Sequence, residues 1–355
     1  IVFGDWSSDV CSSDLEDRKW MRRALRLARQ AWGRTSPNPL VGAVVVREDR
    51  EVGAGFHRLA GTPHAEVHAL RAAGEAARGA TLYVTLEPCR THGRTPPCTE
   101  AILAAGVARV VVGCTDPNPA HAGKGIEDLR AAGVEVRTGV LESECRELNE
   151  AFFWWITQRR PYVLLKLATT LDGKIATAAG QSQWITGPAA RRRVQRLRQW
   201  CDAIMVGGET VRSDDPSLTV RSPRDWPCQP LPLVWTSRPL PPDCRLARRD
   251  ARTVKPRTPG EWVALLAELG RQNVTALLLE GGGELAASAL AARVVNRVAF
   301  FLAPKILGGR DSRPAVGGPE RTSLDDAWQL DRLRVERVGD DLLLQGNCRD
   351  VYRID

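Results

Sequence analysis

No stretch of this sequence is apolar over the roughly 18 or more residues that a membrane helix requires, so no transmembrane segment is expected. The nine cysteines are scattered and lack the regular spacing of a disulfide framework. Because such frameworks form in oxidising compartments, their absence favours a reducing, cytoplasmic location. Internal repeats are absent too, and the two halves of the chain do not resemble each other.

Runs of basic residues are also missing, although the chain carries a formal charge of +8 at pH 7. The arginines are spread along the sequence, so the charge alone does not indicate nucleic acid. A phosphorylated small molecule needs cationic contacts equally. We therefore expect neither a nucleic-acid nor a membrane partner. With 355 residues, 43% of them hydrophobic, the chain is too long for one ordinary core and predicts two domains.

The N-terminal end has neither the basic start nor the apolar stretch of a signal peptide. Residues 1–15 show no helical or strand periodicity, and they resemble the translation of a sequencing adapter fused in frame. We expect a foreign, disordered prefix, with the native sequence beginning near Glu16.

Hydrophobic periodicity predicts a first domain over residues 16–145. Strands are expected at 41–46, 51–56, 80–86, 109–114 and 134–140, and helices at 17–32, from 64, at 98–105 and at 125–132. Alternating helices and strands predict a three-layer α/β fold. One helix over 142–158 is expected to bridge the domains, so that residues 146–160 form the connection.

A second α/β domain is predicted over residues 161–355. Strands are expected at 162–168, 203–207, 233–235, 275–280 and 297–303, and helices at 188–200, 261–270 and from 284. Prolines cluster between residues 222 and 260, which leaves that stretch without a clear pattern.

The strongest chemical signal lies in the first domain. His64, Cys89 and Cys98 offer one imidazole and two thiols, and Glu66 stands two residues after the imidazole. A catalytic zinc takes three protein ligands and keeps a fourth position for water, whose pKa it lowers towards about 7. Glu66 then suits the role of a proton shuttle, as in zinc deaminases of nucleobases. Those enzymes usually space the two cysteines by two residues, whereas residues 90–97 separate them here.

Further motifs follow in a fixed order along the chain. They are Pro37-Asn38-Pro39, His92-Gly93-Arg94-Thr95-Pro96-Pro97-Cys98, Lys166, Thr170-Leu171-Asp172-Gly173-Lys174, Ser182-Gln183-Trp184-Ile185-Thr186, Asp214-Asp215-Pro216 and Glu280-Gly281-Gly282. Together with the zinc motif they resemble the bifunctional deaminase–reductase family of riboflavin biosynthesis, over about residues 17–346. The resemblance implies a cytidine-deaminase-like domain followed by a dihydrofolate-reductase-like domain.

For the first domain, the resemblance implies zinc-dependent deamination of 2,5-diamino-6-(5-phosphoribosylamino)pyrimidin-4-one. His64, Cys89 and Cys98 would bind Zn²⁺, and Glu66 would be catalytic. The residues expected to line the pocket for this phosphorylated pyrimidine are Asn38, His57 and Arg94. An amide suits a pyrimidine edge, and a guanidinium suits a phosphate.

For the second domain, the resemblance implies NADPH-dependent reduction of the ribosyl group to a ribityl chain. The expected substrate-binding residues are Lys166, Ser182, Arg198, Arg221 and Glu280. The expected cofactor-binding residues are Ala168, Trp184, Thr210, Asp214, Ser237, Gly282 and Gly283, within a loop that reaches Ser288. Glycines let the backbone approach a pyrophosphate at a helix start. The family also implies a homo-oligomer.

Two alternatives remain at this stage. One is a deaminase of tRNA or another nucleobase substrate with an unrelated second domain. The other is a structural zinc module joined to a degenerate reductase domain, although such a site would not need Glu66. The family usually has Ser-His after the first zinc cysteine, whereas this chain has Arg90-Thr91. One pocket contact of the family is therefore missing.

Overall fold

A computed structural model describes residues 12–92 and 96–351. The chain divides into two compact units between Thr157 and Gln158. Over the ranges described, no helix combines the length and apolarity that crossing a bilayer would demand.

Unit 1 is built on a five-stranded mixed sheet of order β2-β1-β3-β4-β5. Its strands are β1 (Gly42–Arg47), β2 (Arg50–Phe56), β3 (Thr81–Leu86), β4 (Arg109–Cys114) and β5 (Glu135–Thr138). The β1–β2 and β1–β3 pairs are antiparallel, whereas β3–β4 and β4–β5 are parallel. The central strands read as continuous apolar runs because helices cover both of their faces.

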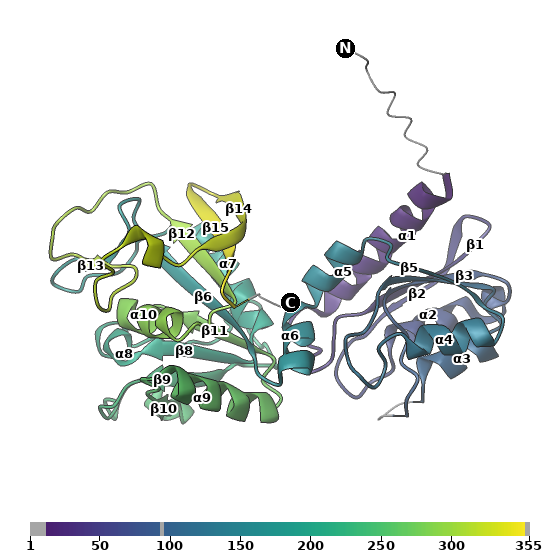
Figure 1. Ribbon diagram of the computed structural model, residues 1–355, viewed down its shortest axis with the longest axis horizontal. Helices are drawn as coiled ribbons and strands as arrows, with labels where there is room; N and C mark the ends of the chain where they lie inside the picture. Colours follow the sequence, from purple (N-terminus) through teal and green to yellow (C-terminus); the bar gives the residue numbers. More distant parts are fainter. Residues whose placement is uncertain (1–11, 93–95, 352–355) are drawn as a thin grey trace, which may run out of the picture. The chain divides into compact units, whose positions relative to one another are not determined.

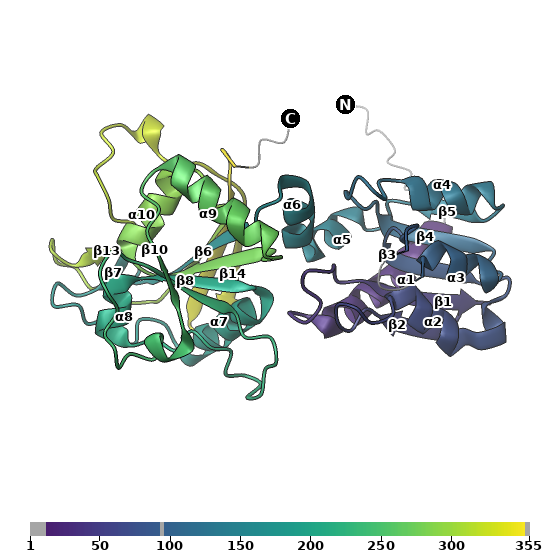
Figure 2. The ribbon, with the colours of Figure 1, turned by 90° about the horizontal axis from the view of Figure 1, so that it is seen from below.

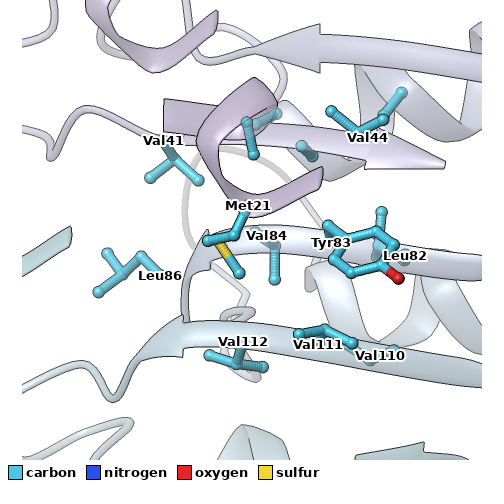
Figure 3. Packing of buried hydrophobic residues seen from close by; sticks show 14 of the residues in the cluster. Met21, Val41, Val44, Leu82, Tyr83, Val84, Leu86, Val110, Val111 and Val112 are labelled. Carbon is cyan, nitrogen blue, oxygen red and sulfur yellow. The ribbon is translucent and has the colours of Figure 1, made fainter. Parts of the chain in front are cut away.

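Helices form the outer two layers of unit 1. They are α1 (Ser12–Ala28), α2 (Ala65–Ala73), α3 (Cys98–Ala104), α4 (Lys124–Ala131), α5 (Glu142–Leu148) and α6 (Glu150–Gln158). In Figure 1, α1 and α5 lie above the sheet, and α2, α3 and α4 lie below it. Met21 of α1 is fully buried and points towards the strand that carries Val84 (Figure 3). The expected three-layer architecture is confirmed.

Unit 2 contains an eight-stranded sheet of order β10-β9-β8-β11-β6-β12-β15-β14. Its strands are β6 (Tyr162–Thr169), β8 (Ala203–Gly207), β9 (Leu231–Trp235), β10 (Arg252–Val254), β11 (Ala276–Glu280), β12 (Arg297–Leu302), β14 (Leu330–Val338) and β15 (Asp341–Cys348). The six strands from β10 to β12 in this order are parallel, and the last two add antiparallel pairs. A short separate pair joins β7 (Lys174–Ala176) to β13 (Arg313–Pro314).

Helices cover both faces of this sheet. They are α7 (Pro188–Trp200), α8 (Gly208–Asp214), α9 (Pro259–Arg271) and α10 (Gly283–Ala291). In Figure 2, α9 and α10 lie on one side of the sheet and α7 lies on the other. Trp262 of α9 and Leu285 of α10 pack with Leu277 and Leu279 of β11 in the core of the unit. Thr258 and Glu261 form a capping box that starts α9.

Two expectations about the ends of unit 1 are wrong. Residues 12–15 form the first turn of α1 instead of a disordered prefix, and Asp14 pairs with Arg137 of β5. The remainder of the prefix lies outside the described residues. The single helix expected at 142–158 is two helices, α5 and α6, because Asn149 interrupts it. The Asn149 side chain exchanges two hydrogen bonds of 2.7 and 2.9 Å with the backbone of Leu40.

Several elements of unit 2 were not expected from the sequence. The strands β14 and β15, the short β10 and the helix α8 all lacked a clear periodicity. β14 is exposed along most of its length, so its residues do not alternate between apolar and polar. The first two residues after Gly346 are part of the sheet, because Asn347 and Cys348 end β15. Asn347 Oδ1 also accepts a 2.8 Å hydrogen bond from Arg297.

Candidate functional site

The three predicted metal ligands come together in unit 1. His64 precedes the first residue of α2, Cys98 begins α3, and Cys89 lies three residues beyond β3. His64 Nδ1 is 3.2 Å from Cys98 Sγ and 3.5 Å from Cys89 Sγ, and all three donor atoms lie within 4.8 Å of one another. One nitrogen and two sulfurs at these separations fit a tetrahedral zinc ion with one further position.

Hydrogen bonds and burial shift the pKa values of the two thiols in opposite directions. The Cys98 thiol and His64 donate to the Cys89 sulfur, which lowers the pKa of Cys89 to about 4. The same bond from Cys98, together with burial, raises the pKa of the Cys98 thiol. The Cys98 backbone N–H also donates to Cys89 Sγ, at 3.4 Å. A thiolate, the form that binds metal, is therefore already favoured at Cys89.

Glu66 lies in the first turn of α2, beside this cluster, and is only 3% exposed. Burial, reinforced by the nearby Cys89 thiolate, raises its pKa to about 7. Its Oε2 atom is buried and has no hydrogen-bond partner among the described residues. A buried, partnerless carboxylate oxygen next to a metal-ligand set is suited to hold and release a proton.

His57 stands next to the metal ligand His64, and Asn38 contacts His57. The His57 and His64 rings meet edge to face, with centroids 5.3 Å apart. His57 Nδ1 is 3.3 Å from the carbonyl oxygen of Pro63, and its Nε2 is 3.2 Å from Asn38 Nδ2. A carbonyl only accepts, so Nδ1 carries the proton and Nε2 accepts from the amide. Burial lowers the pKa of His57, which agrees with a neutral ring.

Glu87 is a supporting residue that sequence reasoning missed. Its carboxylate accepts hydrogen bonds from the backbone N–H groups of Asp116, Gly123 and Gly125, at 2.9 to 3.1 Å. It thereby fixes the loop before α4 against the segment that carries Cys89. A carboxylate at the end of an otherwise apolar strand was the signal available in the sequence.

Arg90, which stands where the family usually has serine, forms an ion pair within unit 1. Arg90 Nε forms a 2.9 Å ion pair with Asp128 of α4, so its guanidinium is engaged within unit 1. Arg94, expected to contact substrate, lies outside the described residues.

Unit 2 contains a cleft of about 970 Å³ at the carboxyl ends of its parallel strands. The twelve residues named individually for substrate or cofactor in this unit line that cleft, whereas the loop expected to reach Ser288 is helix α10, whose Ser288 hydroxyl accepts a hydrogen bond from Trp262 in the core. The twelve residues are Lys166, Ala168, Ser182, Trp184, Arg198, Thr210, Asp214, Arg221, Ser237, Glu280, Gly282 and Gly283. The structure thus brings together residues that are spread over more than a hundred positions of the sequence.

Three charged side chains form a buried cluster in the cleft. Arg198 makes two bonds to the Glu280 carboxylate, at 2.8 and 2.9 Å, and a third to the Thr219 carbonyl, at 3.0 Å. Lys166 Nζ lies 3.8 Å from Glu280 Oε1. Burial alone would raise the pKa of Glu280, but Arg198 and Lys166 hold it below its usual value. Glu280 therefore stays ionised.

Other predicted residues occupy the walls of the cleft. Ser182 Oγ donates to both carboxylate oxygens of Asp214, at 3.0 and 3.1 Å. The Trp184 ring is 62% exposed and carries the Arg191 guanidinium 4.6 Å from its centroid. Arg221 is exposed, and its backbone N–H donates to Gln195.

The glycine segment after β11 gives the cleft an open backbone. Gly281 and Gly282 both have φ of +96°, a conformation that favours glycine. A Cβ on Gly282 would meet Thr210 Oγ1 at 3.6 Å, and one on Gly283 would meet the Pro314 carbonyl at 2.8 Å. α10 begins at Gly283, so its free N–H groups face an anion placed here.

Comparison with family models agrees with this division. Residues 15–114 match the cytidine and deoxycytidylate deaminase zinc-binding region, and residues 161–344 match the RibD C-terminal domain. Unit 1 is thus a cytidine-deaminase-like domain, and unit 2 is a RibD reductase domain with the dihydrofolate-reductase-like fold. The match over unit 2 counts against a deaminase with an unrelated second domain.

Similar proteins extend over nearly the whole chain. The riboflavin biosynthesis protein RibD of Synechocystis is 45% identical and covers 94% of this chain and 96% of its own length. RibD of Escherichia coli is 42% identical, covering 93% and 99%. Among solved structures, Acinetobacter baumannii RibD matches with a TM-score of 0.86 at 37% identity, covering 94% of this chain and 99% of that one.

A Thermotoga maritima structure matches with a TM-score of 0.84 at 34% identity, covering 95% of this chain and 99% of that chain. That Thermotoga maritima protein is named a diaminohydroxyphosphoribosylaminopyrimidine deaminase/5-amino-6-(5-phosphoribosylamino)uracil reductase. With a zinc-type deaminase unit, a reductase unit and relatives over nearly its whole length, the chain belongs to the RibD family of bifunctional riboflavin-biosynthesis enzymes.

Proposed function

We propose that unit 1 deaminates 2,5-diamino-6-(5-phosphoribosylamino)pyrimidin-4-one and that unit 2 then reduces the ribosyl group of the product with NADPH. The observation that carries the proposal is the partnerless Glu66 oxygen beside the His64, Cys89 and Cys98 donors. The name of the Thermotoga maritima relative supplies the substrate class.

In unit 1, His64, Cys89 and Cys98 would hold Zn²⁺, which supplies a water of lowered pKa when it is bound. Glu66 takes a proton from the attacking water and returns it to the departing amino group. A C–O bond forms at the ring carbon as the C–N bond breaks, and the nitrogen leaves as ammonia. A pKa of about 7 suits Glu66 to both halves of this exchange.

The pyrimidine is positioned by residues whose own hydrogen bonds are already fixed. Neutral His57 accepts from the Asn38 amide and donates to Pro63, so the Asn38 oxygen remains to read the pyrimidine edge. We assign the phosphate of the deaminase substrate to Arg94, by resemblance.

In unit 2, the pyrimidine nucleotide would lie against Lys166, Glu280 and Arg221, with Ser182 beside Asp214. The Arg198 guanidinium donates to the Glu280 carboxylate and to the Thr219 carbonyl oxygen. We therefore assign Arg198 the role of keeping Glu280 ionised and in position. The NADPH pyrophosphate would occupy the Gly282–Gly283 segment, with Thr210, Ala168 and Trp184 along the cofactor and Ser237 towards its far end. NADPH supplies the hydride when it is bound.

We also propose a homo-oligomer in a reducing, cytoplasmic setting. β14 ends the large sheet and leaves Leu333 59% and Val335 60% exposed, as expected of a strand that a second copy covers. Eight cysteines fall within the described ranges, and all of them are free thiols. Sedimentation of the protein with Leu333→Lys would reveal a shift to a smaller species.

A coupled assay tests the two activities. Purified protein receives the diaminopyrimidinone ribosylamino phosphate, and ammonia release and NADPH oxidation are followed separately, with and without a zinc chelator. We expect ammonia first and NADPH consumption afterwards, with both lost in the chelated sample. NADPH consumption without prior ammonia release would contradict the order of steps. A protein that binds zinc but releases no ammonia would contradict the assignment of unit 1.

A further inference from the structure

We propose that Lys305 is a positioning residue of the reductase site, which holds the segment carrying Trp184 in place to bind NADPH. The inference rests on the proposed function, because it assumes that the unit 2 cleft binds the cofactor along Trp184. Lys305 lies in the loop after β12 and is not among the described residues that line the cleft. It therefore acts through the residue that it holds.

The Lys305 side chain bonds to the backbone of the cleft wall. Its Nζ atom donates to the Trp184 carbonyl oxygen at 2.9 Å, across 121 positions of the sequence. Residues 182–186 line the cleft and form turns and bends that belong to no helix or strand. Their position therefore depends on contacts such as this one. A hydrogen bond from a charged group contributes more than one between neutral groups.

The backbone of Lys305 is itself fixed by the turn before β7. The Leu171 N–H donates to the Lys305 carbonyl oxygen at 2.7 Å. The Asp172 carboxylate accepts from the Leu307 and Gly308 N–H groups, at 3.1 and 2.8 Å. A lysine side chain is long and has many rotamers, so it can place a remote carbonyl only from a backbone that is held in this way.

Other contacts hold the two ends of the same segment. Ser182 Oγ donates to both carboxylate oxygens of Asp214, at 3.0 and 3.1 Å. Arg191 of α7 donates to the carbonyl oxygen of the last residue of the segment, at 2.8 Å. The bond from Lys305 holds the middle, at Trp184. Loss of that bond should therefore displace Trp184 and leave Ser182 in place.

Steady-state kinetics of Lys305→Met should separate the two ligands of unit 2. This substitution keeps an unbranched apolar side chain and removes the donor. Because Trp184 is assigned to the cofactor and Ser182 to the pyrimidine, KM for NADPH should rise about fivefold and KM for the pyrimidine by less than about twofold. A contact made equally in the ground and transition states affects binding only, so kcat should stay nearly constant. Lys305→Arg keeps a donor and should restore most of the NADPH affinity.

A measurement without turnover locates the effect at Trp184. In protein labelled with fluorotryptophan, the fluorine resonance of Trp184 is the one that Trp184→Phe removes. In the absence of NADPH, Lys305→Met should shift or broaden this resonance and leave that of the fully buried Trp262 unchanged. Equilibrium binding of NADPH, followed by the fluorescence of the bound cofactor, should weaken about fivefold in the same variant.

Arg310→Met is the matched control. Arg310 is an exposed cation of the same loop and is likewise not among the described residues that line the cleft. Because NADPH is an anion, a long-range effect of charge alone would weaken its binding in both variants. Equal losses in the two variants, an unchanged NADPH affinity in Lys305→Met, or an unchanged Trp184 resonance would each overturn the inference. If the unaltered protein did not bind NADPH, the proposed function of unit 2 itself would be wrong.

Discussion

The Glu66 side chain is buried, and its Oε2 atom has no hydrogen-bond partner among the described residues. These two properties suit Glu66 to proton transfer, whereas His64, Cys89 and Cys98 are suited to bind the metal. Glu66→Gln keeps the size and the hydrogen-bonding capacity of the side chain but removes its ability to accept a proton. We expect deamination to fall by about 10³-fold or more. Zinc content measured by atomic emission and NADPH oxidation with the deaminated substrate should both stay unchanged. Loss of zinc in this variant would show that Glu66 is a ligand.

Asp172 is an exposed residue with an unusually specific set of partners. Its carboxylate accepts from the Leu307 and Gly308 backbone N–H groups at 3.1 and 2.8 Å, which ties the turn before β7 to the loop after β12. The Thr170 side chain and these two N–H groups lower the pKa of Asp172 to about 2. The depressed pKa means that this link is fully present above about pH 4 and is lost as the pH falls towards 2.

Hydrogen exchange measures this link directly. At neutral pH, Asp172→Asn should speed amide exchange at Leu307 and Gly308 and should spare the strands of the sheet. In the unaltered protein, an acidic medium should produce the same local effect. Asp311→Asn is a control, because Asp311 is an exposed carboxylate in the same loop region. Equal exchange rates in the two variants would mean that Asp172 does not hold the loop.

The metal site could be predicted from the spacing of its own residues, whereas the unit 2 residues, far apart in sequence, were predicted only through the family resemblance. One helix–strand–helix segment contains the metal ligands and the proton shuttle, namely His64, Glu66, Cys89 and Cys98. Their order and spacing in the sequence were therefore enough to predict a zinc site. Glu87 was not identified because its partners lie 29 to 38 residues further on, in the loop before α4 and the first turn of α4, and hydrogen bonds to backbone N–H groups leave no residue pattern.

At the level of elements, close packing of α2 on β2 fixes the metal ligands. A Cβ on Gly55 would lie 2.5 Å from the His68 Cβ and 2.7 Å from the Ala65 carbonyl oxygen. Both atoms belong to α2, which carries Glu66 and begins next to His64. Because backbone cannot yield at such distances, Gly55→Ala should push α2 away from the sheet.

We expect Gly55→Ala to lower the free energy of unfolding by about 1–3 kcal/mol and to weaken zinc binding. Urea unfolding and competition with a zinc chelator measure the two effects. Gly260→Ala is the control, since no atom lies within 4 Å of a Cβ at that position in α9. There alanine should raise the free energy of unfolding by about 0.4–1 kcal/mol. Unchanged zinc affinity in Gly55→Ala would mean that α2 does not position the ligands.

Elements with a buried face were predictable, and elements without one were not. β6, β8 and β11 are almost wholly buried and appeared as apolar runs. β14 has seven of its nine positions exposed, so its identity as a strand comes from its partner β15 and not from its own residues. Asn149 likewise ends α5 through a contact with Leu40, a residue more than a hundred positions away.

At the level of the whole molecule, each ligand should act on the unit that contains its site. Removing zinc should speed amide exchange in β3, α2 and α3, where the ligands are anchored, and should leave β8 and β11 unchanged. Adding NADPH should slow exchange around the unit 2 cleft, at Gly282 and Gly283 and near Thr210 and Ser237, and should leave unit 1 unchanged, because a ligand stabilises the state that binds it. Exchange mass spectrometry with both ligands in turn measures this pattern. Changes in both units on adding either ligand would contradict separate sites.

The place of β6 in its sheet bears on how the chain folds as the ribosome makes it. All strands of unit 1 lie between Gly42 and Thr138, so that unit can close early. β6 pairs with β11 on one side and β12 on the other, and Tyr162 meets its partner Ala276 only after most of unit 2 has emerged. Until then both edges of a very apolar strand are unpaired, which is a hazard for aggregation. During synthesis the chain is therefore prone to aggregate from the time β6 emerges until β11 and β12 pair with it. Slow elongation between β6 and β11 would lengthen this period.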